Sequence, residues 1–142
     1  AQDLNARALF PFGTPRRPFT SWALRSSRAW SSPVHLLVHD VAGLWVSYRG
    51  ALLLPDSLPL PEPSPNPCNS CHDRPCLSAC PASALTASGY DLEACHTFLD
   101  TPPGQNCMKT GCAVRKACPQ SQKYHRMEAQ SAFHMDQFHT CR

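Results

Sequence analysis

Cysteines are concentrated in two short stretches of this 142-residue sequence. The first stretch has the pattern C-x2-C-x4-C-x3-C-P and consists of Cys68, Cys71, Cys76, Cys80 and Pro81. The second runs from Cys107 through Cys112 to Cys118 and also ends in proline. Deprotonated thiols are ligands of zinc and of iron-sulfur clusters, and such sites draw several of them from one short loop. We therefore expect a metal or cluster site around which the rest of the chain is organised.

The two Cys-Pro pairs, Cys80-Pro81 and Cys118-Pro119, suggest how the ligands are shared. In bacterial ferredoxins with two clusters, the cysteine of such a pair ligates the cluster other than that of its own loop. This rule predicts one [4Fe-4S] cluster on Cys68, Cys71, Cys76 and Cys118. The remaining thiols form a second set of four: Cys80, Cys95, Cys107 and Cys112. We expect Cys141, next to the last residue, to be a free thiol.

Two other uses of the nine cysteines stay open. Two zinc sites would need the same eight thiols, and Cys68-x-x-Cys71 is a common zinc pair. Zinc sites usually combine two knuckles of similar spacing, however, and the spacings here are unequal. Disulfides are the third possibility, although nine is an odd number and the loops are too crowded for relaxed pairing. The spacing therefore favours clusters.

The composition limits what the chain can be. Fifteen prolines and six glycines in so short a chain leave a small core that needs covalent or metal links. A net charge of +3 is too small to predict a nucleic-acid surface, and no apolar run is long enough for a transmembrane span. No catalytic triad, phosphate loop or dinucleotide motif is present. These features predict a protein that is not an enzyme on its own and works with a protein redox partner or in a larger multi-subunit complex.

The predicted fold class is α+β, small and irregular, with a β-hairpin half joined to a ferredoxin-like half. Residues 1–33 form an extended arm rich in Arg and Ser, a composition that resembles an organelle transit peptide. We expect a β-hairpin at 34–54 and a Pro-rich linker at 55–67. A two-cluster ferredoxin-like domain with short helices follows at 68–126, and a C-terminal helix and tail at 127–142.

Helices are expected where they bring cysteines toward the core. Asp91 is a plausible N-cap for a helix over 92–99, whose apolar spacing places Cys95 on the inward face. A second short helix is expected over 108–117. Basic side chains around the second cysteine stretch, including Arg115, form either a docking surface for an acidic partner or a solvated face.

A family resemblance accompanies these motifs. The stretch C-x2-C-x4-C-x3-C-P is followed by A-L-T at 84–86 and by Y-D-L-x-x-C-x-x-F-L at 90–99. Together with Gly43-Leu44-Trp45 and Leu58-Pro59-Leu60-Pro61 upstream, this resembles the two-cluster ferredoxin-like domain of the epoxyqueuosine reductases. The family pattern is tighter, with C-x2-C-x2-C-x3-C-P. The resemblance implies that Cys95 is a ligand of the second cluster.

The segments Y-R-G-A-L-L at 48–53 and A-F-H-M at 132–135 are also similar to those of small alphaproteobacterial-type ferredoxins, which implies electron transfer. The reductases carry a corrinoid-binding catalytic domain and a helical repeat, neither of which is seen here. The first hypothesis is an electron-transfer protein with two [4Fe-4S] clusters, in mitochondria (matrix side) or the bacterial cytoplasm. The alternatives are a structural accessory subunit of a larger, for example respiratory, complex, and the redox domain of a split enzyme.

Overall fold

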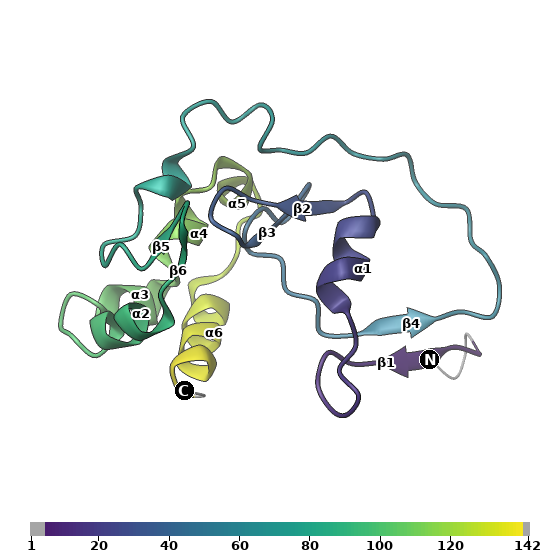
Figure 1. Ribbon diagram of the computed structural model, residues 1–142, viewed down its shortest axis with the longest axis horizontal. Helices are drawn as coiled ribbons and strands as arrows, with labels where there is room; N and C mark the ends of the chain where they lie inside the picture. The colour runs from purple at the N-terminus through teal and green to yellow at the C-terminus, as the bar shows by residue number, and fades with distance from the viewer. Residues whose placement is uncertain (1–4, 141–142) are drawn as a thin grey trace.

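Short helices and strands follow one another along residues 5–140, the part of the chain that the computed structural model describes. Together they make a small mixed α/β protein, with α6 the longest of the described helices. Figure 1 shows the elements in this order: β1 (Arg7–Leu9), α1 (Phe19–Arg25), β2 (Ala29–Ser31), β3 (Leu37–His39), β4 (Ala51–Leu53), the 3-10 helix η2 (Pro75–Leu77), β5 (Leu85–Thr86), β6 (Gly89–Tyr90), α2 (Leu92–Leu99), α3 (Gln105–Thr110), α4 (Ala113–Ala117), α5 (Pro119–Lys123) and α6 (Glu128–Thr140).

The described strands form antiparallel pairs: β1 with β4, β2 with β3, and β5 with β6. The predicted hairpin within 34–54 is therefore wrong, because β3 and β4 each pair with a strand of the N-terminal arm. Gly43 turns the chain with a φ of +56°, and the residue after it donates its N–H to Ser121 Oγ at 2.8 Å. Residues 44–48 therefore turn away from β3, and a single bridge between His39 and Gly43 is the pairing left.

The N-terminal arm is not simply extended. Beyond its first four residues, which lie outside the described part, it contains β1, α1 and β2. The rings of Phe19 and Trp22 in α1 lie 5.1 Å apart, and Ala23 of the same helix is buried. The arm is thus folded onto the chain that follows it, since two of its strands supply the partners of β3 and β4.

The Pro-rich segment from 55 to 67 has no regular structure, as its composition predicts. It runs as a long arc from β4 to the first cysteines (Figure 1). One backbone hydrogen bond, from Ser64 N–H to the Ser27 carbonyl at 3.3 Å, connects it to the loop between α1 and β2.

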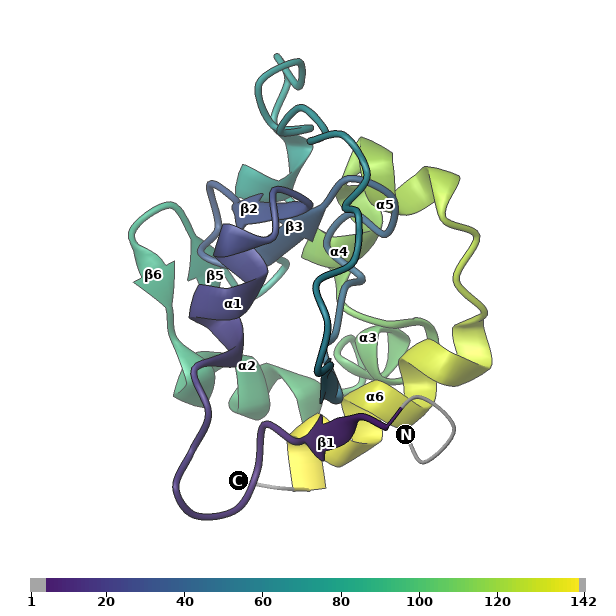
Figure 2. The same ribbon diagram turned by 90° about the vertical axis from the view of Figure 1, so that its right-hand side faces the viewer.

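The helices around the later cysteines agree only in part with the helices predicted from the sequence. The prediction of α2 is confirmed: Asp91 accepts a hydrogen bond from the Ala94 N–H at 2.9 Å as its N-cap. The single helix expected over 108–117 is wrong, because the chain breaks at Gly111, which has a φ of +97°, into α3 and α4. The closing helix α6 packs against α3 (Figure 2).

Two groups of buried side chains make up the core, and both contain cysteines. The first group combines Val34, Val38, Leu44, Cys76, Leu85, Val114 and Cys118. The second group combines Leu99, Cys107 and Met135. Residues from 34–44 therefore share a core with the cysteine stretches, and Cys112 packs against both groups.

None of the helices within residues 5–140 is long and apolar enough to cross a membrane.

Candidate functional site

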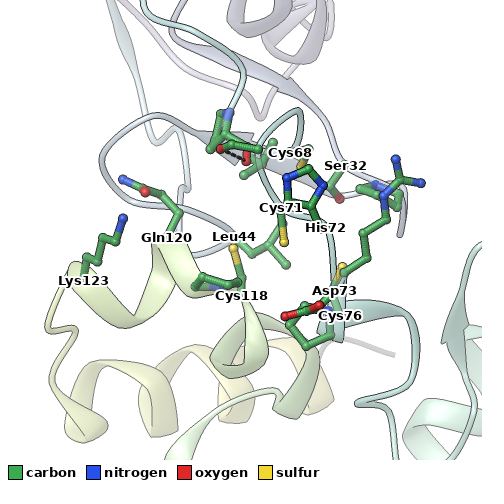
Figure 3. A pocket seen from close by; sticks show the side chains of 17 residues that line it. Ser32, Leu44, Cys68, Cys71, His72, Asp73, Cys76, Cys118, Gln120 and Lys123 are labelled. Carbon is green, nitrogen blue, oxygen red and sulfur yellow. Dashed lines mark hydrogen bonds between the residues drawn. The ribbon is translucent and has the colours of Figure 1, made fainter.

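The first candidate site is a cavity of about 470 Å³ surrounded by four cysteines. Figure 3 shows Cys68, Cys71, Cys76 and Cys118 around it. Leu44 and Ser32 line its inner side, while exposed polar residues such as His72 and Lys123 stand at its rim. This cavity brings together the first three cysteines of the chain and one that lies more than 40 residues later.

Local structure explains how these four thiols converge. The N–H of Cys68 donates to Asn66 Oδ1 at 2.9 Å, and its carbonyl accepts from Cys71 at 3.3 Å, which closes the loop tightly. Cys76 lies in η2, which begins after Arg74, a residue in the left-handed region with a φ of +40°. Cys118 is the N-cap of α5, and the proline after it opens that helix, a position that needs no N–H.

The second candidate site is a cavity of about 80 Å³ with mainly apolar walls. It is lined by the other four cysteines, Cys80, Cys95, Cys107 and Cys112. Cys95 comes from α2 and the buried Cys107 from α3, while Cys112 is the N-cap of α4. The break at Gly111 turns the chain, and thiols from two successive helices therefore line one cavity.

All eight of these cysteines are free thiols, so none of them takes part in a disulfide. Cys141 lies outside the described residues. A single zinc ion needs its ligand atoms within about 2.3 Å of one point. Over residues 5–140, no three or more His, Cys, Asp or Glu side chains gather in a group that could hold one metal ion.

Two thiols of each site are buried enough to resist ionisation. Burial raises the pKa of Cys68 and of Cys76, and the neighbouring thiolates raise it further, whereas Arg74 opposes the shift. Burial likewise raises the pKa of Cys95 and of Cys112. Four thiolates in one cavity repel each other, so their ionisation requires a bound positive group. Each cavity thus offers four cysteine thiols, a donor set of the kind that binds metal ions or iron-sulfur clusters.

Two residues at the second cavity were not assigned to it from the sequence. The Tyr90 hydroxyl donates a hydrogen bond to Cys95 Sγ at 3.4 Å. Arg115, which the sequence suggested for a docking surface, instead lines the cavity and donates to the Leu44 carbonyl at 2.6 Å. The five-residue step from Tyr90 to Cys95 could not identify this contact, because it depends on how β6 leads into α2.

Comparison with known proteins finds partial similarity to one kind of enzyme. Over 78 residues the chain is 32% identical to the epoxyqueuosine reductases of Vibrio cholerae and of Aliivibrio fischeri. The match covers 54% of this chain and 20% of each relative, so the chain spans about a fifth of their length. No protein-family model matches the chain, and no solved structure matches it. The similarity agrees with the resemblance found in the cysteine pattern.

The comparison corrects one prediction. The expectation that the chain is not an enzyme is wrong by this finding, because both relatives are named for a reductase. Both organisms are bacteria, and the finding lends no support to a mitochondrial location.

Proposed function

We propose that this chain is an iron-sulfur electron-transfer module of a reductase and binds two [4Fe-4S] clusters in a ferredoxin-like arrangement. One cluster is held by Cys68, Cys71, Cys76 and Cys118, and the other by Cys80, Cys95, Cys107 and Cys112. The observation that carries the proposal is the grouping of eight free thiols into two sets of four, each around its own cavity. The similarity to two reductases supports a role within an enzyme.

The clusters supply one-electron chemistry, at potentials that in proteins span roughly −700 to +450 mV. The chain's own contribution is to hold them and control their surroundings. Apolar side chains such as Leu36 and Phe98 line the second cavity. The rim of the first cavity carries the exposed side chains of His72 and Lys123, which suits contact with an electron donor. Electrons then pass from the first site toward the second.

Metal analysis is the direct test of the proposal. Protein purified without oxygen should contain about eight irons and eight acid-labile sulfides per chain, because each [4Fe-4S] cluster holds four of each. Electron paramagnetic resonance after dithionite should show two interacting reduced clusters. About two zinc ions per chain and no sulfide would reject the proposal in favour of structural zinc sites.

Four single variants test the sharing of ligands between the loops. Cys118→Ser should leave the same residual spectrum as Cys71→Ser, because both residues belong to the first set. Cys80→Ser should leave the same residual spectrum as Cys95→Ser. The comparison is matched, since Cys80 and Cys118 both precede a proline. If Cys80→Ser matched Cys71→Ser instead, each loop would hold its own cluster and the crossed assignment would be wrong.

The catalytic partner of the module is also testable. The resemblance to epoxyqueuosine reductases implies that a corrinoid-binding catalytic part works with such clusters. Cobalamin that copurifies with the full-length native protein, or with the complex that contains it, would support this pairing. Absence of any corrinoid from an active, cluster-loaded complex would reject the pairing and leave the cluster assignment standing.

A further inference from the structure

The second cavity differs from the first in the polar groups that face its thiols. Its walls are mainly apolar, but they include the Tyr90 hydroxyl and the Arg115 guanidinium. The hydroxyl donates directly to the sulfur of Cys95, at 3.4 Å.

Arg115 brings a positive charge to the same place. Its side chain is partly buried, and burial lowers its pKa, although an arginine in a protein stays protonated. The charge stands close enough to Cys112 for the two to interact electrostatically. Cys112 is the N-cap of α4, so the backbone N–H groups of Val114 and Arg115, in the first turn of that helix, also lie near its sulfur. The sulfur of Cys112 therefore faces a cation and two hydrogen-bond donors.

No carboxylate side chain of the described residues forms an ion pair with this cation. Within residues 5–140, three ion pairs join Arg28 and His39 to Asp40 and His139 to Asp100, and none of them includes Arg115. The other charged groups that act on the region are also basic: Arg126 and Arg49 lie near His134, which itself lines the cavity. Burial and these arginines lower the pKa of His134 to about 4, so its ring is neutral at pH 7. A negatively charged group held by the four cysteines of this cavity would therefore face Arg115.

We propose that Arg115 and Tyr90 raise the reduction potential of the group bound by Cys80, Cys95, Cys107 and Cys112. Reduction adds one electron, and hence one negative charge, to this group without making or breaking a bond to the protein. A nearby cation and hydrogen bonds to the ligand sulfurs favour the more negative state, and potentials of iron-sulfur groups respond to both. The effect is large here because low-polarity walls screen the charge of Arg115 poorly.

The first cavity lacks an equivalent arrangement. The basic residues at its rim, Arg74 and Lys123, are exposed, and water and salt screen exposed charges strongly. Tuning by a partly buried cation is therefore expected at only one of the two sites. This inference rests on the proposed function, because it concerns the cluster that function requires.

The test is a redox titration followed by electron paramagnetic resonance, with iron and sulfide measured on every sample. Arg115→Gln removes the charge, and Arg115→Lys keeps it on a different side chain. Tyr90→Phe removes only the hydroxyl. The matched control is Lys109→Gln, which removes an exposed charge from α3.

In the fully loaded protein, Arg115→Gln should shift one midpoint potential to a more negative value and leave the other unchanged. Tyr90→Phe should shift the same potential in the same direction by less, whereas Arg115→Lys should recover most of the wild-type value. Lys109→Gln should change neither. The shifted potential should belong to the cluster that Cys95→Ser removes.

Unchanged potentials in Arg115→Gln and Tyr90→Phe at full iron content would overturn the inference, as would a shift of the cluster that Cys71→Ser removes. If Arg115→Gln binds less iron than the wild type, Tyr90→Phe decides the matter, because it deletes a single oxygen. A wild-type protein without iron and sulfide would instead refute the proposed function, so the two failures are distinguishable.

Discussion

The side chain of Ser121 connects two segments that lie far apart in the sequence. It is buried in α5, and its hydroxyl oxygen accepts the N–H of Leu44 from a segment 77 residues earlier. Gly43 lies against it so closely that a side chain there would collide with the Ser121 backbone. This contact connects the turn after β3 to the helix that follows Cys118, and so fixes one wall of the first cavity.

Ser121→Ala should lower the free energy of unfolding by about 1 to 3 kcal/mol, because it leaves the buried Leu44 N–H without an acceptor. Urea denaturation of the loaded protein measures the change. Ser57→Ala in the exposed Pro-rich segment is the control and should leave the urea midpoint unchanged. Equal midpoints for the two variants would mean that water satisfies the Leu44 N–H instead.

The break between the helices α3 and α4 was not predicted from the sequence. Gly111 ends α3 in a conformation that other residues rarely adopt, and helix α6 and Trp45 cover it closely. The sequence indicates α2 well, because its cap and its apolar spacing are both local. It cannot indicate this break, or the pairing of β3 with β2, because both depend on residues far along the chain.

Gly111→Ala should destabilise the protein by more than about 1 kcal/mol, since φ is +97° and the new Cβ would lie 2.8 Å from Ser131 Cβ. Gly13→Ala separates the two causes: its φ is +93°, but nothing lies within 4 Å of the new atom. Thermal unfolding of both variants measures the difference. A smaller loss for Gly111→Ala than for Gly13→Ala would show that α6 moves aside without cost.

On the scale of the whole molecule, the cysteines occupy the place that apolar side chains fill in larger proteins. Both buried groups of the core contain them, and Cys112 contacts both. The two Cys-Pro pairs predict two sets of four thiols, since that rule depends on ligand chemistry, and the same two sets line the two cavities. The surroundings of the sets were not predictable, because Tyr90 and Arg115 reach the second cavity only through the fold.

The metal-free protein should lose stability as the pH rises above about 9. Burial raises the pKa of Cys68, Cys76, Cys95 and Cys112 above the ordinary value of 9.0. A pKa that is higher in the folded than in the unfolded state stabilises the fold below the unfolded value. This contribution disappears as the pH passes through the folded value.

Urea midpoints of the metal-free chain at pH 7.5 and pH 10, followed by circular dichroism, measure this effect. The midpoint should be lower at pH 10. A variant with serine at these four positions should show a smaller difference between the two pH values. A midpoint that stays constant or rises with pH would contradict the assigned burial of the thiols.

The position of Cys118 in the first cavity also has a consequence for biosynthesis. A ribosome makes Cys68, Cys71 and Cys76 early, but the fourth thiol of that cavity follows only after all four of the second cavity have been made. A nascent chain that ends before residue 118 therefore offers no complete first set. A cluster held by these four thiols could therefore be completed only after Cys118, which follows α4, had been synthesised.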